Sequence, residues 1–134
     1  MSKREWVSVR HVMRADVTLV NGRMDVLEAL RTMKRVKATC LIVEKRHERD
    51  EYGMVLFSDI AKQVIGRDRA PERVHVYEIM SKPVISVEPG MDIRYCARLF
   101  EKFGISHAPV IENGEVIGIV SYYLLALEGL PELD

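Results

Sequence analysis

The chain has 134 residues, of which 48% are hydrophobic and 30% are charged, so it is long enough for one compact domain or two small units that share a core. Lys plus Arg equals Asp plus Glu at 20 each, and this balance gives no support for a nucleic-acid or membrane partner. Cys40 and Cys96 are too few for a disulfide scaffold or a thiolate metal site, which favours a cytoplasmic setting. We expect neither a signal peptide nor a transmembrane helix, because no long apolar run occurs.

The first predicted elements occupy residues 17–66. The β-branched run 17–20 predicts a strand, and the turn 21–23 follows it. Asp25 stands at the N-cap of an amphipathic helix, whose apolar residues recur at helical spacing: Val26, Leu27, Leu30, Met33 and Val36. A hairpin over 39–57 and a second helix over 58–66 complete this part of the chain.

The later part of the chain predicts the same elements in the same order. A strand at 84–87 and a turn at 88–90 precede a helix that Asp92 caps and Gly104 ends. The apolar positions of this helix are Ile93, Ala97, Phe100 and Phe103. A hairpin over 106–121 turns at Asn113-Gly114, a strong hairpin signal, and a helix over 122–130 follows.

These two parts are copies of one pattern, with matching residues 67 positions apart. Identical pairs include Met13 and Met80, Val17 and Val84, Val20 and Val87, Met24 and Met91, Asp25 and Asp92, Arg31 and Arg98, and Val43 and Val110. At Gly53 and Gly118 the difference falls to 65, because the charged hairpin loop of the first copy is longer. We therefore predict repeat one at 8–66, a charged linker at 67–75 and repeat two at 76–128.

Each repeat reads as strand, helix, strand, strand, helix, which predicts a mixed α/β (α+β) fold. A helix between the first two strands indicates a crossover connection. One repeat of roughly 60 residues would bury little core. We therefore expect the two β-α-β-β-α units to pack about a pseudo-two-fold axis as one tandem module, with two related clefts between them.

Both repeats resemble the CBS domain, the family named after cystathionine beta-synthase. The stretches GISHAPVIENGEVIGIVS (104–121) and MSKPVISVEPGMDI (80–93) carry the resemblance in repeat two, and VMRADVTLV (12–20) and GMVLFSDI (53–60) carry it in repeat one. The resemblance covers about residues 8–127. The chain looks like a stand-alone tandem CBS pair.

That resemblance implies a regulatory module whose clefts bind an adenine nucleotide (AMP, ADP or ATP) or S-adenosylmethionine, with no required cofactor, and which forms a homodimer. In the family the glycine-led strand ends in Ser/Thr-x-x-Asp. The Asp accepts hydrogen bonds from the ribose hydroxyls, and the Ser/Thr helps to hold phosphate. The chemistry agrees, since a carboxylate suits a cis-diol and hydroxyls at a helix start suit an anion.

Carried over to this sequence, the family pattern gives two unequal sites. Repeat one has Asp59 with Ser58 but Leu56 at the Ser/Thr position, and repeat two has Ser121 with His107 but Leu124 at the Asp position. The base-flanking positions are Thr18, Leu19, Thr39, Cys40 and Leu41 in repeat one, and Ile85, Ser86, Ser106, Ala108 and Pro109 in repeat two. We expect the Asp59 cleft to bind the nucleotide and the other cleft to be weakened.

Each of these polar residues also has a structural interpretation. Asp59, Ser58 and Ser121 can act simply as helix caps, and His107 can be structural, with no role in phosphate binding or pH sensing. The basic residues Lys34, Arg35, Lys37, Arg98 and Lys102 are interpreted mostly as surface charges, with one or two within reach of a phosphate. Tyr122 and Tyr123 can pack at a dimer surface or fill the second cleft.

We find no sequence pattern for catalysis or for a metal. The chain lacks a Ser-His-Asp arrangement, a P-loop and a Gly-rich dinucleotide turn. Its four His residues show no metal-ligand spacing. The alternative to a nucleotide sensor is a structural module with degenerate clefts that binds a protein partner.

Overall fold

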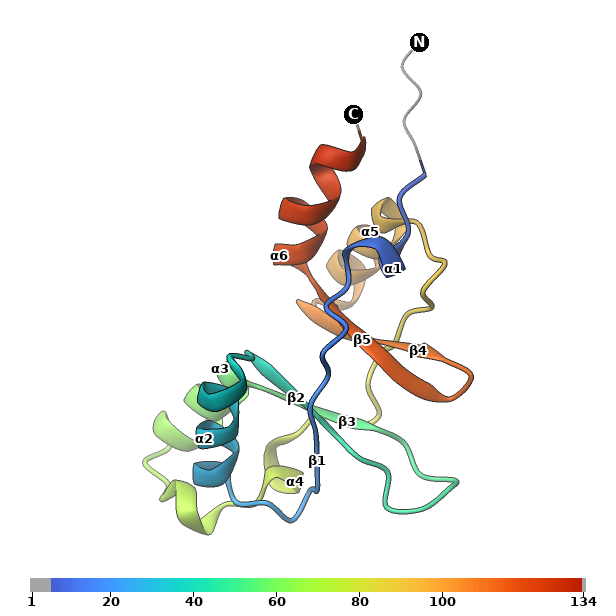
Figure 1. Ribbon diagram of the computed structural model, residues 1–134. Coiled ribbons are helices and arrows are strands. Elements are labelled where there is room, and N and C mark those ends of the chain that lie inside the picture. Colours follow the sequence, from blue (N-terminus) through green and yellow to red (C-terminus); the bar gives the residue numbers. More distant parts are fainter. Residues whose placement is uncertain (1–5, 134) are drawn as a thin grey trace. The chain divides into compact units, whose positions relative to one another are not determined.

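The computed structural model describes residues 6–133, and its compact units do not coincide with the sequence repeats (Figure 1). The central unit is Thr18–Val84. The terminal unit combines the described residues up to Val17 with those from Ile85 onward. Each repeat therefore contributes its opening residues to the unit that holds the body of the other repeat.

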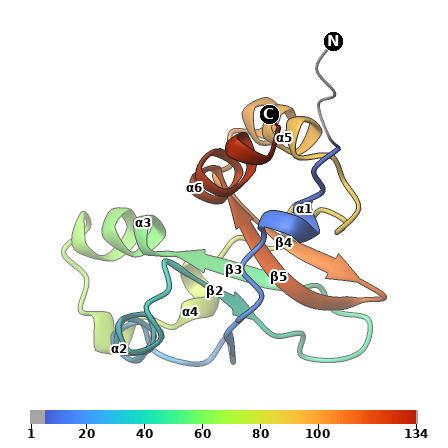
Figure 2. The ribbon, with the colours of Figure 1, turned by 45° about the horizontal axis from the view of Figure 1, so that its top comes forward.

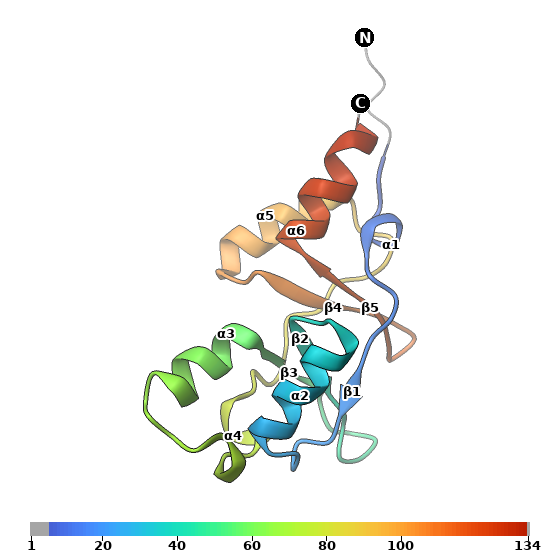
Figure 3. The ribbon, with the colours of Figure 1, turned by 60° about the vertical axis from the view of Figure 1, so that its left-hand side comes forward.

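The central unit contains a three-stranded sheet in the order β1 (Leu19–Val20), β2 (Cys40–Val43), β3 (Gly53–Leu56). β1 runs parallel to β2, and β2 runs antiparallel to β3. Helix α2 (Val26–Val36) forms the predicted crossover between β1 and β2, because parallel neighbours cannot be joined by a tight turn. Figure 3 shows α2 lying beside this sheet.

The other helical segments of the central unit are short. α3 (Phe57–Ile60) continues into a π-helix at Ala61–Ile65, and a 3₁₀ turn at Pro71–Arg73 precedes α4 (Val76–Ile79). The core is aliphatic and consists of Val20, Val26, Ala29, Met33, Leu41, Val43, Val55, Ile60, Val64, Val74, Val76 and Ile79.

The segment predicted as a linker, residues 67–75, packs into the central unit. Val74 is 2% exposed and belongs to the core. Its carbonyl accepts a hydrogen bond of 2.8 Å from the backbone N–H of Val26, the first residue of α2. The charged residues of this segment suggest a solvated linker, but Val74 among them is buried and holds the segment against the central unit.

The terminal unit is built on the hairpin of β4 (His107–Glu112) and β5 (Glu115–Ser121). Helix α5 (Ile93–Phe103) and helix α6 (Tyr122–Leu124) lie on one side of it (Figure 2). α6 continues as a π-helix at Leu125–Gly129 and a 3₁₀ helix at Leu130–Leu133. Phe100, which is fully buried, belongs to a core that also includes Val9 and Val12 of α1 (Val9–Val12).

The strand predicted at 84–87 was wrong in extent, because only Val87 pairs, as an isolated bridge with Val110. In the central unit the backbone N–H of Ile42 donates to the Thr18 carbonyl over 3.0 Å and extends the pairing. The matching position in the terminal unit is Pro109, which has no N–H to donate. One proline thus reduces a strand to a single bridge.

The opening segments dock through two glycines. Arg14 and Ile119 exchange backbone hydrogen bonds of 2.9 Å, and a Cβ on Gly118 would lie 2.6 Å from the Met13 sulfur. In the central unit a Cβ on Gly53 would lie 2.7 Å from the Met80 sulfur, so the absence of a side chain lets each methionine segment approach its strand.

Four local predictions were confirmed. Asp25 accepts from the Glu28 N–H and Asp92 from the Arg94 N–H, both over 2.9 Å, so each caps its helix. Gly104 ends α5 in the left-handed conformation, and Asn113 and Gly114 both have positive φ at the hairpin turn.

Among the described residues, no helix is long and apolar enough to cross a membrane.

Candidate functional site

The positions predicted in repeat one meet at one end of the central sheet. This end holds the starts of β1 and β2 and the end of β3, as the pairing of Cys40 with Leu56 shows. The N–H of Phe57 donates to the carbonyl of Thr39 over 2.9 Å and fixes the start of α3 beside the start of β2. The strand register alone therefore brings 18–19, 39–41 and 56–59 together.

Asp59 supplies the one carboxylate among these positions. Its Oδ2 accepts a 2.8 Å hydrogen bond from the backbone N–H of Leu56, the residue at the N-cap of α3. Among residues 6–133 this is the only hydrogen bond of the Asp59 side chain, so Oδ1 has no protein donor. The side chain is half-buried, and Ser58 beside it is also half-buried. Capping of the helix therefore uses one carboxylate oxygen and leaves the other available.

Two exposed apolar side chains accompany Asp59. Leu19 is 44% exposed and Phe57 is 55% exposed. Phe57 was not singled out from the sequence, where it looks like the last apolar residue of a strand. Its place directly before Ser58-Asp59 was the available signal, and the structure places it as the first residue of α3. Both are apolar side chains of the kind that lines small-molecule sites.

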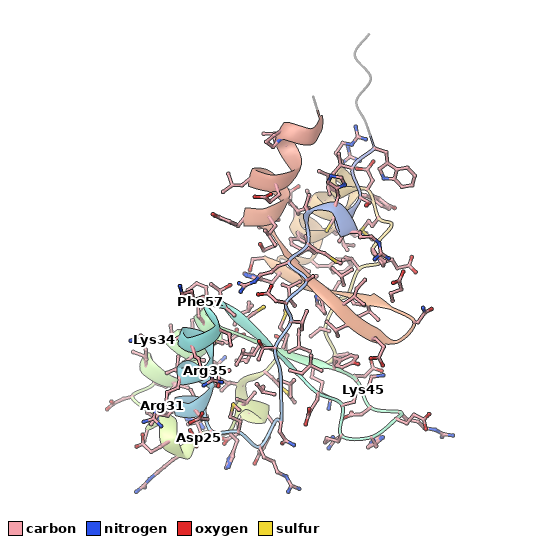
Figure 4. The ribbon with its side chains drawn as sticks, in the orientation of Figure 1. Asp25, Arg31, Lys34, Arg35, Lys45 and Phe57 are labelled. Carbon is pink, nitrogen blue, oxygen red and sulfur yellow. The ribbon has the colours of Figure 1, made fainter. Side chains whose placement is uncertain are left out.

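Two basic side chains lie at the C-terminal end of α2. Lys34 and Arg35 lie in its last turn, and within the described residues neither side chain makes a hydrogen bond or an ion pair. Figure 4 shows Phe57 beyond the end of α2 that carries these two residues, while Asp25 marks the opposite end. Basic side chains at a helix C-terminus complement the helix dipole, and they also attract an anion.

The remaining base-flanking positions of repeat one differ in exposure. Thr39 is exposed and Thr18 is half-buried, whereas Cys40 is 8% exposed and Leu41 is fully buried. Leu41 belongs to the core of the central unit. Its side chain therefore supports the surface from below, and the exposed contacts of this end come from Thr39, Leu19 and Phe57.

The equivalent turn of the terminal unit is arranged differently. Ser121 is 7% exposed and its hydroxyl accepts a 3.2 Å hydrogen bond from the Leu124 N–H, which caps α6. Leu124 is half-buried and offers no carboxylate. The Ser121 oxygen therefore caps α6, as one of the two sequence interpretations expected.

His107 lies opposite Ser121 in the β4–β5 register. Its Nδ1 is 2.8 Å from the Ser106 hydroxyl, and the Ser106 carbonyl accepts from the Tyr122 N–H over 3.2 Å. The structure thus brings Ser106, His107 and Ser121 together. Among the other predicted positions, Ala108 is fully buried, Pro109 is buried, Ile85 is half-buried and Ser86 is exposed.

The cysteines and the possible metal ligands complete the description of the candidate residues. Both cysteines are buried and neither forms a disulfide, and burial raises the pKa of Cys96 to about 11, so its thiol stays protonated at neutral pH. Within residues 6–133, no cluster of His, Cys, Asp or Glu could hold a metal ion.

The chain belongs to the CBS domain family, whose pattern matches residues 9–66 and 76–125. The two matched segments follow the predicted repeats, and the tandem CBS fold that the sequence predicted is confirmed.

A protein of unassigned function from Methanopyrus kandleri is 31% identical over 117 residues, which cover 86% of this chain and 59% of that protein. The structure also resembles a hexameric CBS-CP12 protein from bloom-forming cyanobacteria, with a TM-score of 0.89 and 37% identity over 91% of this chain and 70% of the other. The CBS domain pair of the protein MJ0100, solved with 5-methylthioadenosine and S-adenosylmethionine, has a TM-score of 0.77 at 20% identity, covering 91% of this chain and 94% of that one. That last likeness concerns the fold alone.

Proposed function

We propose that this chain is a regulatory module that senses an adenine nucleotide or a related adenosine compound at the Asp59 end of the central sheet. The observation that carries the proposal is the Asp59 carboxylate, which caps α3 with Oδ2 and keeps Oδ1 available beside exposed Leu19 and Phe57. A ribose diol suits the open carboxylate oxygen, and an adenine ring suits the apolar side chains. The complex of MJ0100 with two adenosine compounds supports this ligand class.

The other residues of this site have supporting roles in the proposal. The Ser58 hydroxyl, with Thr39 and Thr18, offers polar contacts around the sugar. Lys34 and Arg35 add positive charge that favours a phosphate-bearing ligand over an uncharged nucleoside. Ser121 and His107 belong to a second, weaker site, since the ribose-binding carboxylate is replaced there by Leu124.

Ligand binding in such a module changes the balance between conformers or assemblies, by as much as the ligand's differential affinity for them. We propose that the output passes through self-association, with a homodimer as the simplest closed assembly. The hexameric cyanobacterial relative shows that a similar chain forms part of an oligomer.

Binding can be tested by the melting temperature of the purified chain with AMP, ADP, ATP, S-adenosylmethionine or 5-methylthioadenosine. A ligand at 100 times its dissociation constant stabilises the folded state by about 2.7 kcal/mol. Absence of a shift with all five compounds at millimolar concentration would contradict the proposal.

Two substitutions separate ligand binding from capping. Asp59→Asn keeps an oxygen that can cap Leu56 but removes the charge, and we expect affinity to fall about tenfold or more while the fold is kept. Asp59→Ala removes both functions. Glu72→Ala, which removes an exposed carboxylate elsewhere in the central unit, is the matched control and should leave affinity unchanged.

A second candidate function is protein binding without nucleotide, and a specific observation favours it. The helices of the terminal unit carry large exposed apolar side chains: Tyr95, Phe103, Tyr123, Leu127 and Leu130. Apolar surface of this kind marks contact sites. Sedimentation of wild type and of a Tyr123→Ser, Leu127→Ser double variant, with and without ligand, distinguishes the candidates. Ligand-independent assembly that the double variant abolishes would favour the second function.

A further inference from the structure

The terminal unit has an open hollow of about 310 Å³ on the exposed side of α5, lined by Asp92, Arg94, Tyr95 and Arg98. None of these residues belongs to the proposed adenosine site. Two guanidinium groups and one carboxylate leave the hollow with an excess of positive charge. Tyr95 is 65% exposed and adds an aromatic wall.

The charges in this hollow are only partly compensated. Arg94 donates from Nε and Nη2 to the two carboxylate oxygens of Asp92 over 3.2 and 3.0 Å. These bonds, reinforced by the nearby charge of Arg98, hold the pKa of Asp92 below its usual value, so Asp92 stays ionised and paired at neutral pH. Within residues 6–133, Arg94 Nη1 has no acceptor, and the Arg98 side chain makes neither a hydrogen bond nor an ion pair.

The repeat shows that this arrangement is particular to α5. Arg31 on α2 matches Arg98, but Glu28 stands where α5 has Tyr95, and its carboxylate lies 3.7 Å from the Arg31 guanidinium. Leu27 stands where α5 has Arg94. The same helical position is therefore paired in the central unit and unpaired in the terminal unit, where a second arginine joins it. Arg31 projects from α2 in Figure 4.

We propose that this hollow binds an oxyanion group, phosphate or carboxylate, of a small molecule, with Arg98 and the free Nη1 of Arg94 as donors and the Tyr95 ring as a flanking contact. The planar guanidinium fork matches both anions in a bidentate geometry. The hollow has the size of a small-molecule site, and its floor is the regular helix α5, which holds both arginines at fixed spacing.

The test is a titration of the ¹⁵N-labelled full chain followed through the arginine Nε–H and backbone amide signals in NMR spectra. The probes are inorganic phosphate, phenyl phosphate and acetate, each against sodium chloride of equal ionic strength. We expect saturable shifts of Arg98, Arg94 and the first turns of α5. Phosphate and acetate distinguish the two oxyanion sources, and tighter binding of phenyl phosphate reports the Tyr95 contact.

Matched variants decide whether the binding is specific. Arg98→Ala should weaken it about tenfold, Arg98→Lys should weaken it less, and Arg31→Ala, at the equivalent position of the other repeat, should leave it unchanged. Asp59→Ala should also leave it unchanged, so the outcome is independent of the adenosine site. Equal weakening by Arg98→Ala and Arg31→Ala, or no saturable shift with any probe, overturns the proposal.

Discussion

The turn from β3 into α3 and the turn from β5 into α6 hold complementary halves of one capping device. A complete capping box has a hydroxyl at the N-cap and a carboxylate three residues later. The first turn keeps only the carboxylate, Asp59, which accepts from the Leu56 N–H. The second keeps only the hydroxyl, Ser121, which accepts from the Leu124 N–H. The first turn therefore satisfies the N–H of its N-cap residue, and the second satisfies the N–H three residues after its N-cap.

The two halves leave different chemistry behind. The Ser121 hydroxyl is nearly inaccessible at 7% exposure and is already bonded. A carboxylate has two oxygens, and Asp59 spends one on the cap and keeps the other. Asp59 therefore caps α3 and still keeps one oxygen without a protein donor among the described residues, whereas the matching residue of the terminal unit, Leu124, has no carboxylate.

The largest expected loss of stability comes from a contact that both units share. In each unit a glycine, Gly118 or Gly53, packs against a methionine, Met13 or Met80. Gly118→Val should destabilise the protein by about 3 kcal/mol, because its Cβ would meet the Arg14 carbonyl oxygen at 3.0 Å as well as Met13. At Gly53 the nearest backbone oxygen, that of Ser81, is 3.3 Å away, so Gly53→Val should cost less, about 1–2 kcal/mol. Urea denaturation measures both.

Gly90→Ala is the control for this pair, since a Cβ there meets nothing within 4 Å. Equal losses of stability from Gly53→Val and Gly118→Val would mean that the methionine side chains, and not the backbone oxygens, set the cost.

A smaller loss of stability is expected from changes to the cap of α6. Ser121→Ala should cost about 1–2 kcal/mol, because a buried N-cap hydroxyl is lost, and the Leu124 amide should exchange its hydrogen faster. Leu124→Asp should complete the capping box and supply a carboxylate to the second turn. If the comparison is right, this variant gains a second adenosine-binding event by calorimetry. If Leu124→Asp binds no more ligand per chain than wild type, the two turns differ in capping but not in ligand binding.

The last prediction concerns Asp50, a residue of the central unit. Its carboxylate accepts hydrogen bonds of 2.9 Å from the Arg46 side chain and N–H and from Lys82. The Arg46 side chain first, and then Lys82, hold the pKa of Asp50 well below its usual range. The stabilisation is therefore complete above the pKa of an unfolded aspartate, about 3.9, and shrinks as the pH falls below it.

Asp50→Asn should accordingly lower the melting temperature at pH 6 and converge with wild type in strong acid. Scanning calorimetry between these limits measures the difference. A constant gap between the two proteins at every pH would show that Asp50 acts through packing and not through its charge.

The local features of this protein were determined by the sequence. The caps at Asp25 and Asp92 and the turn at Asn113-Gly114 depend on partners within a few residues, so residue type and spacing suffice to predict them. The sequence also predicted the hairpin of β2 and β3, but the register that pairs Cys40 with Leu56 was found only in the structure.

Only the tertiary structure decided which unit holds each methionine segment. Met13 and Met80 have equivalent neighbours in sequence, and long-range packing places Met13 against Gly118 and Met80 against Gly53. It also decided that the charged segment before α4 packs through Val74, and that Asp59 keeps an oxygen available while Ser121 does not. Such outcomes depend on burial and on hydrogen-bond partners that local propensities leave unspecified.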